Sequence, residues 1–123
     1  MKFNEDIPIY LQIKEEIENA ILTNTIREED KVSSIRELAQ QYRLNPQTIS
    51  NAVSELINEG ILYKKRGIGM FVEKGAQKKL KKKKDSEFRN SDLKKLVLKS
   101  KSLGITKTEL LNILDLIYEE GGK

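Results

Sequence analysis

The chain has 123 residues, of which 34% are charged, and its 23 basic and 19 acidic side chains leave a net charge of +4. It contains no cysteine and no histidine, which excludes disulfides, thiol chemistry, histidine-based catalysis and zinc sites built from these two residues. This length fits one ordinary domain with a small appendage.

No segment approaches the roughly 20 consecutive apolar residues of a membrane span, and no long apolar stretch follows the first lysine. We therefore expect a cytoplasmic protein that does not contact a membrane. The charge is unevenly distributed: residues 1–73 hold 9 basic and 12 acidic side chains, residues 74–101 hold 12 and 3, and residues 102–123 hold 2 and 4. A basic segment of this kind usually contacts phosphates or acidic surfaces.

Pro8 predicts the start of a first helix that runs to about Thr23. Its apolar residues recur at helical spacing, and the charged residues between them are expected on the solvent side. The apolar residues are Tyr10, Ile13, Ile17, Ala20 and Ile21, and the charged ones are Lys14, Glu15, Glu16 and Glu18. Residues 24–33 lack periodicity, which indicates a loop.

Residues 33–60 predict two helices joined by a tight turn. Ser34 and Glu37 have the spacing of a capping box at the start of the first of these helices. Asn45 followed by Pro46 starts the second, and Gly60 ends it. The outward side chains near the start of this second helix are small amides and hydroxyls, which can pair with base edges in DNA; they are Gln47, Thr48, Ser50 and Asn51.

After Gly60 the pattern becomes extended, and it predicts strands at residues 61–63 and 70–72. Gly67 and Gly69 permit a tight hairpin between them, with Lys64, Lys65 and Arg66 at or beside its tip. The predicted fold class is therefore mainly α (α+β), with a winged helix-turn-helix DNA-binding domain at residues 1–75. A simple solvated turn is the alternative interpretation of the basic hairpin tip.

Residues 74–90 are poor in apolar side chains and strongly basic, which allows either a flexible linker or a helix that begins after Gly75. This segment either contacts phosphates directly or is a solvated surface. A further helix is expected from Asp92 to Gly104. Thr106 and Glu109 then predict a capping box, flanked by a hydrophobic staple between Ile105 and Leu110.

Residues 76–123 thus form a basic linker or helix followed by a helical dimerisation tail. The last helix is apolar on more than one face, and two such helices cannot bury that surface against each other alone. We expect a second copy of the chain to cover it, while packing against the chain's own first domain is the alternative. The expected dimerisation residues are Leu93, Leu96, Val97, Leu103, Leu110, Leu111, Ile113, Leu114, Ile117 and Tyr118.

These segments resemble the GntR-type bacterial transcription regulators, and the size and tail are similar to its small YtrA-type subfamily. The resemblance is carried by PIYLQI, VSSIRELA, NPQTISNAVSEL, EGIL, GIGMFV and the C-terminal LGITKTELLNIL, and covers nearly the whole chain. It implies that Ser34 and Arg36 face DNA, that the helix starting at Asn45 enters the major groove, and that Gly67 and Gly69 let the wing approach the minor groove. The chain departs from the family pattern at Ser33, Asn51 and Met70, where proline, arginine and threonine are common; the changes at Ser33 and Met70 should affect loop stiffness and one wing contact.

The leading hypothesis is a homodimeric transcriptional repressor that binds an inverted-repeat operator in double-stranded DNA, with two recognition helices in successive major grooves. Residues 45–59 contain no lysine or arginine, so phosphate contacts must come from Arg36, Arg43, the wing and the basic segment. Glutamine and asparagine favour adenine, and we expect A·T pairs at the positions read by Gln47 and Asn51.

Two other functions remain open: a nucleic-acid-binding architectural protein that uses the lysine-rich segment without sequence preference, and a winged helix that contacts only proteins. An enzyme is not expected, because the acidic residues lie on helix exteriors and in the loop at residues 28–30, and no phosphate-binding glycine loop is present. No cofactor or metal is expected. About 45 residues follow the wing, and whether they create a small-molecule effector pocket stays open.

Overall fold

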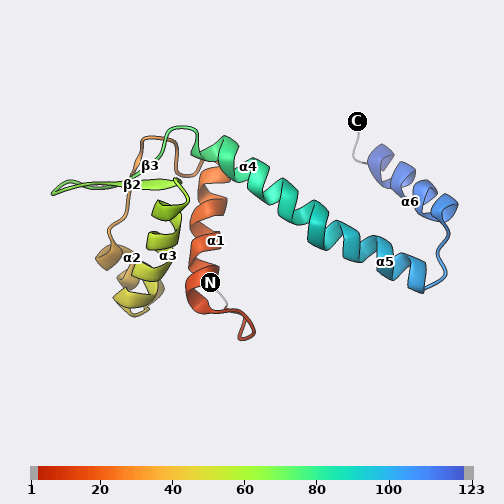
Figure 1. Ribbon diagram of the computed structural model, residues 1–123, viewed down its shortest axis with the longest axis horizontal. Coiled ribbons are helices and arrows are strands. Elements are labelled where there is room, and N and C mark those ends of the chain that lie inside the picture. The colour runs from red at the N-terminus through yellow and green to blue at the C-terminus, as the bar shows by residue number, and fades with distance from the viewer. Residues whose placement is uncertain (1–2, 121–123) are drawn as a thin grey trace. The chain divides into compact units, whose positions relative to one another are not determined.

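The computed structural model describes residues 3–120, which fall into two compact units that meet between Lys83 and Lys84. The first unit holds α1 (Ile9–Leu22), β1 (Lys31–Val32), α2 (Ile35–Tyr42), α3 (Pro46–Asn58), β2 (Leu62–Lys65), β3 (Gly69–Val72) and the start of α4 (Ala76–Glu87) (Figure 1). This element order is that of a winged helix-turn-helix, as the sequence predicts.

The three strands form one antiparallel sheet in the order β1-β3-β2. Tyr63 pairs with Phe71 across the hairpin, and Val32 pairs with Met70 on the other side of β3. The prediction of a loop at residues 24–33 is therefore wrong at Lys31 and Val32, which form β1. A strand of two residues is too short to show alternation of apolar and polar side chains, and its partner β3 lies far along the chain.

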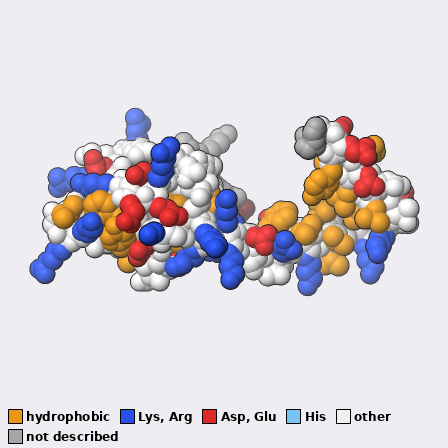
Figure 2. Space-filling model, turned by 90° about the horizontal axis from the view of Figure 1, so that it is seen from above, with side chains coloured by type: hydrophobic (Ala, Val, Ile, Leu, Met, Phe, Trp, Pro, Cys, Tyr) orange, Lys and Arg blue, Asp and Glu red, His pale blue; other side chains and the backbone are white. Residues whose placement is uncertain are grey.

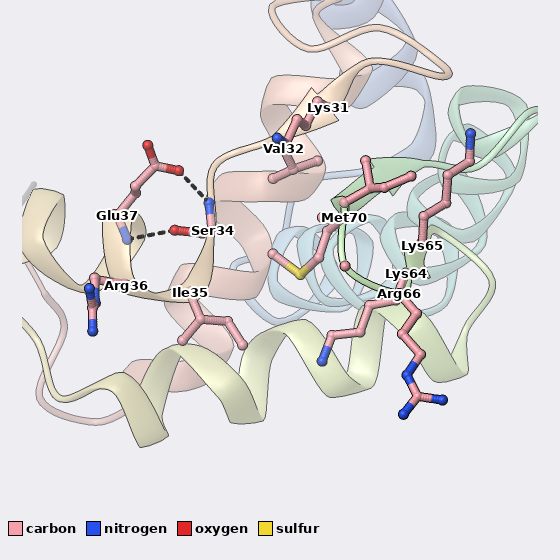
Figure 3. Close-up of a pocket in the computed structure, with 13 residues that line it drawn as sticks. Lys31, Val32, Ser34, Ile35, Arg36, Glu37, Lys64, Lys65, Arg66 and Met70 are labelled. Carbon is pink, nitrogen blue, oxygen red and sulfur yellow. Dashed lines mark hydrogen bonds between the residues drawn. The ribbon is translucent and has the colours of Figure 1, made fainter.

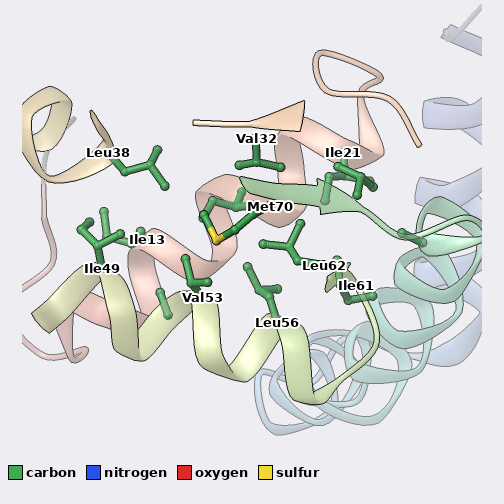
Figure 4. Packing of buried hydrophobic residues seen from close by; sticks show 14 of the residues in the cluster. Ile13, Ile21, Val32, Leu38, Ile49, Val53, Leu56, Ile61, Leu62 and Met70 are labelled. Atoms are coloured by element: carbon green, nitrogen blue, oxygen red, sulfur yellow. The ribbon is translucent and has the colours of Figure 1, made fainter. Parts of the chain in front are cut away.

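The hydrophobic core of the first unit is formed by α1, α2, α3, the sheet and the start of α4 (Figure 4). Ile13, Ile49, Ala52 and Leu56 are completely buried. These residues follow the helical spacing of α1 and α3, so that each helix buries one face against the other. The core fixes the orientation of α3 relative to the sheet.

Two charged residues of α1 are also buried, which corrects the expectation that they face solvent. Lys14 is 8% exposed and Glu18 is 2% exposed. Nζ of Lys14 lies 3.1 Å from Oε1 of Glu55 and also contacts the carboxylate of Glu59. Burial of these charges is tolerated because each has a partner of opposite sign.

Lys83 of α4 connects the same network to the C-terminal end of α3. Its Nζ lies 2.9 Å from Oε2 of Glu18 and 3.1 Å from Oε1 of Glu59. Partial burial alone would lower the pKa of Lys83, but the two carboxylates outweigh it and raise that pKa above its ordinary value of 10.5. Similarly, burial would raise the pKa of Glu59, yet Lys14 and Lys83 hold it below 4.5. The network therefore favours the charged state at neutral pH.

The helix expected after Gly75 is present, and its first two turns belong to the first unit. Ala76 and Leu80 are completely buried. The carboxylate of Glu28 accepts hydrogen bonds from the backbone amides of Gly75 and Gln77, at 2.8 and 3.3 Å. Glu28 thus caps α4 from a loop some 47 positions earlier, rather than simply being solvated.

The second unit continues α4 through the π-helical turn η1 (Phe88–Leu93) into α5 (Lys94–Ser102), and ends with α6 (Lys107–Glu120). The predicted capping box at the start of α6 is confirmed: the Thr106 amide donates to the Glu109 carboxylate at 2.9 Å, and the Glu109 amide donates to the Thr106 hydroxyl at 3.1 Å. No residue of η1, α5 or α6 is buried. Across residues 3–120, no helix is long and apolar enough to cross a membrane.

Candidate nucleic-acid interface

The start of α2 is fixed by the predicted capping box. The Glu37 amide donates to the Ser34 hydroxyl at 3.1 Å, and the Ser34 amide donates to the Glu37 carboxylate at 2.8 Å (Figure 3). These hydrogen bonds lower the pKa of Glu37, so its charge is engaged by the cap. Arg36, between the two capping residues, is exposed and accessible to a negatively charged ligand.

The turn between α2 and α3 places an arginine and an asparagine on the surface. Arg43 ends α2 with a left-handed φ of 55°, a conformation that costs a side chain other than glycine some strain. Oδ1 of Asn45 accepts a hydrogen bond from the Gln47 amide at 2.8 Å, and Pro46 occupies the first helical position, as predicted. This cap leaves the first turn of α3 open to solvent.

The exposed side of α3 is a row of uncharged polar residues: Gln47, Asn51, Ser54 and Asn58. Nε2 of Gln47 donates to Oδ1 of Asn51 at 3.0 Å, so the two amides form one surface that still presents an acceptor and donors. Thr48 and Ser50 are half-buried and therefore less accessible than predicted. Ser54 was missed, although the spacing from Gln47 and Asn51 places it on the same face.

A groove of about 600 Å³ lies between the wing and the start of α2 (Figure 3). Its walls carry five basic side chains and one acidic side chain, and its remaining lining is mostly apolar. The basic residues are Lys31, Arg36, Lys64, Lys65 and Arg66; the acidic one is Glu37; the others are Val32, Ser34, Ile35, Gly67, Ile68, Gly69 and Met70. Because the five basic side chains outnumber the single carboxylate, the groove has a net positive charge that favours anions.

Lys31 is the basic residue of this groove that sequence reasoning missed. It lies on β1, beside Gly69 of β3, where a side chain would place its Cβ 2.8 Å from Cε of Lys31. Gly69 also has a φ of 144°, which side chains rarely adopt. The φ favours glycine at this position, whereas the contact alone could be relieved by movement of the flexible end of Lys31. The neighbourhood of Lys31 and Gly69 is revealed only by the pairing of β1 with β3.

The wing is stiffened by its own side chains. The rings of Tyr63 and Phe71 stack with centroids 5.7 Å apart, and Nζ of Lys65 lies 4.9 Å from the centroid of the Phe71 ring. Lys64 and Lys65 belong to β2, because the strands extend closer to the tip than predicted. Met70 is 4% exposed and packs in the core (Figure 4), and it also lines the groove. Its expected effect on one wing contact stays a prediction.

The predicted DNA-binding residues thus fall into two adjoining groups. Ser34, Arg36, Lys64, Lys65, Arg66, Gly67 and Gly69 line the groove, whereas Arg43, Asn45, Gln47, Thr48, Ser50 and Asn51 belong to the turn and to α3. Their role in binding stays a prediction. In the described part of the chain, no cluster of three or more acidic side chains is arranged to hold a metal ion.

Comparison with known proteins agrees with this architecture. Residues 9–72 match the family described as bacterial regulatory proteins of the gntR family. The chain is 36% identical over 123 residues to the uncharacterised HTH-type transcriptional regulator YhcF of Bacillus subtilis, covering 98% of each protein. It is 33% identical over 103 residues to the transcriptional repressor YtrA of the same organism, covering 84% of this chain and 78% of the relative.

Among solved structures, the DNA-binding domain of AraR in complex with its operator ORE1 is similar to this chain, with a TM-score of 0.53 and 34% identity. The match covers 58% of this chain and 89% of the AraR domain. The matching relatives are regulatory proteins and not enzymes. The extent of the family match and the nearly full-length similarity to YhcF establish that the chain belongs to the GntR family, as a small helix-turn-helix DNA-binding transcriptional regulator.

Proposed function

We propose that the protein is a homodimeric repressor that binds an inverted-repeat operator in the bacterial cytoplasm. The basic groove between the wing and α2, next to the uncharged polar face of α3, carries this proposal. The names of YtrA and of the AraR complex describe a repressor and an operator-bound domain, which supports the same activity here.

We assign phosphate binding and the recognition of base sequence to different residues. Arg36 and the wing lysines and arginine supply positive charge for phosphates, which position a protein on DNA without reading its sequence. The amide pair of Gln47 and Asn51 presents an acceptor and donors to the major groove, and adenine offers the complementary N6 donor and N7 acceptor. We therefore propose A·T pairs at the positions that these two residues read.

Dimerisation through the second unit would give the protein the two-fold symmetry that an inverted-repeat operator has. Large apolar side chains are exposed along α5 and α6, among them Leu103 at 68%, Ile117 at 56% and Leu96 at 53%. No residue of these helices is buried within the chain, and exposed apolar surface of this extent is typical of a protein interaction site. A second copy is the proposed cover, since closed two-fold dimers are the commonest assembly.

The operator proposal is tested by fluorescence anisotropy with DNA from upstream of the protein's own operon and with a scrambled duplex, at two salt concentrations. A regulator should prefer its site by several kcal/mol, typically about 4–10. Arg36→Ala should weaken binding and flatten the salt dependence, while the matched variant Arg89→Ala, at an exposed arginine of the second unit, should do neither. Equal affinity for the scrambled duplex contradicts the proposal.

The dimer is tested by sedimentation equilibrium of the full chain. Leu114→Asp places a charge on the apolar face of α6 and should shift the mass from dimer to monomer, whereas Lys99→Asp, at an exposed position of α5, should leave the dimer intact. A wild-type protein that stays monomeric at micromolar concentration rules out this arrangement. The operator measurement remains informative in that case, because it does not require the tail.

A further inference from the structure

A second positive surface lies at the start of α4 and in the turn just before it, apart from the groove already described. It consists of Lys74, Lys78, Lys81 and Lys82, here called the lysine face, and all four side chains are exposed. Figure 2 shows basic side chains gathered over this part of the molecule. Lys78, Lys81 and Lys82 have the i, i+3, i+4 spacing that places side chains on one side of a helix.

The other side of the same two turns is occupied by the protein itself. Ala76 and Leu80 are buried in the core, Lys79 donates to the backbone carbonyl of Glu59 at 3.4 Å, and Lys83 pairs with Glu18 and Glu59. By contrast, no residue of the lysine face forms an ion pair with another residue in the range 3–120. The lysines of α4 thus divide into inner ones with partners and outer ones without.

The outer lysines cost the helix stability. Like charges four positions apart, such as Lys78 and Lys82, repel each other. The first turn of α4 contains no acidic residue, although the helix dipole favours acids there. The amides that start the helix are already capped by Glu28, so an incoming anion must be bound by the lysine side chains. An anionic ligand would relieve both the repulsion and the unfavourable interaction with the dipole.

The chemistry of the lysine face favours a nucleic-acid backbone. Protein interfaces are enriched in aromatic residues, methionine and arginine and depleted in lysine, and no aromatic or arginine side chain occurs between residues 74 and 83. A helix that lies in a membrane surface needs a free apolar face, and here that face is buried against α1 and the core. Lysine point charges suit phosphates that are contacted without regard to base sequence.

The lysine face is also remote from the base-reading end of α3. Lys79 and Lys83 reach Glu59, which ends α3, whereas Gln47 and Asn51 lie at its start. A helix of 13 residues is about 20 Å long, which exceeds the distance of about 8 Å over which exposed charges interact in physiological salt. The lysine face is therefore largely screened from the phosphates that lie beside the start of α3.

We propose that the lysine face binds the phosphate backbone of a second segment of double-stranded DNA, without sequence preference, while α3 and the wing hold the operator. That the duplex is a second one rests on the operator docking proposed above; that the face binds DNA does not. The protein would then bridge its operator to another stretch of DNA.

The test is a capture experiment with the full chain. A short operator duplex is immobilised and saturated with protein, and a labelled 30-base-pair duplex of random sequence is added in 50 mM or 200 mM salt. The wild-type protein should retain the labelled duplex at 50 mM and lose most of it at 200 mM, because each phosphate contact releases counterions. The variant in which Lys74, Lys78, Lys81 and Lys82 are all changed to glutamine should retain at least fivefold less.

Glutamine is a good helix former, so circular dichroism of this fourfold variant should match the wild type, and its affinity for the short operator should stay within about twofold. A groove variant, Arg36→Gln with Lys65→Gln, should bind the operator more weakly and still bind random DNA through the lysine face. If the proposed function fails, operator preference is absent from the wild type, yet the comparison of wild-type and fourfold variant on random DNA still tests the lysine face.

Three outcomes would overturn the proposal. The first is equal retention of the second duplex by the wild type and the fourfold variant. The second is no retention by the wild type even at 50 mM salt. The third is lysine-dependent binding to vesicles of anionic phospholipid with no lysine-dependent binding to DNA, which would assign the face to a membrane surface.

Discussion

Replacement of Lys83 by methionine tests whether the buried ion-pair network holds α4 to the rest of the first unit. Nζ of Lys83 lies 2.9 Å from Glu18 and 3.1 Å from Glu59, and the Glu18 side chain is only 3% exposed. Methionine keeps the length and the apolar part of the side chain but removes the charge. The buried carboxylate of Glu18 then loses its cationic partner, while Glu59 keeps Lys14.

The size of the expected loss of stability follows from how deeply Lys83 and Glu18 are buried. Removal of one partner from a fully buried ion pair costs about 3–5 kcal/mol, but the Lys83 side chain is 31% exposed and Glu18 makes a further interaction. Water and that interaction offset part of the loss. We expect Lys83→Met to lower the free energy of unfolding by about 2 kcal/mol, which is less than the loss of one partner costs in a fully buried pair.

The assay is urea-induced unfolding at one fixed protein concentration, because dimerisation makes stability depend on concentration. The matched control is Lys82→Met on the solvent side of the same helix, which should change the free energy of unfolding by less than about 0.5 kcal/mol. The double variant Glu18→Gln with Lys83→Met should be more stable than Lys83→Met alone, since it removes a buried charge that has lost its ion pair with Lys83. Equal unfolding curves for Lys83→Met and Lys82→Met would refute the structural role of the network.

Four further outcomes follow from the first unit. Ser34→Ala should destabilise the protein by about 1 kcal/mol through loss of the cap, whereas Ser33→Ala should not, as measured by urea unfolding. Lys31→Ala should weaken binding to all duplexes and reduce the slope of log affinity against log salt by about 1. Asn51→Arg should shift selected operator sequences towards G·C at one position in each half-site, and an unchanged selection profile would contradict the docking of α3. The pKa of Glu59 is lowered below 4.5 on folding, so its stabilisation is complete above pH 4.5 and is lost as the pH falls through the lowered pKa; Glu59→Gln should make acid unfolding less steep.

The parts of the fold that the sequence predicted are those determined by neighbouring residues. Both capping boxes join residues three positions apart, and the hydrogen bonds at Ser34 and at Thr106 are present as expected. The buried stripe of α1 and the glycine turn at Gly60, with a φ of 75°, are equally local. Such patterns depend on backbone geometry within one or two turns, which a single sequence contains.

The features that the sequence did not predict depend on contacts between residues far apart along the chain. Lys14 was expected in solvent because helical spacing treats every charge as polar, and its partner Glu55 is 41 positions away. Glu18 pairs with Lys83 at a separation of 65 positions. Lys31 lines the groove only because β1 pairs with β3. No periodicity within a short window reports such contacts.

The distribution of charge links these long-range contacts to recognition. α3 carries no basic residue, and the charged residues at its C-terminal end, Glu55 and Glu59, are both bound to lysines of α1 and α4. A free carboxylate at Glu55, one turn beyond Asn51, would repel the phosphates flanking the groove that α3 enters, by Coulomb interactions that act over about 8 Å in physiological salt. The pairing of Glu55 with Lys14 at 3.1 Å reduces that repulsion, whereas the pairing of Glu59 with Lys83 lies at the far end of α3 and anchors α4. On this reasoning Lys14 contributes to DNA affinity as well as to stability, while Lys83→Met and Lys82→Met should bind the short operator duplex with equal affinity.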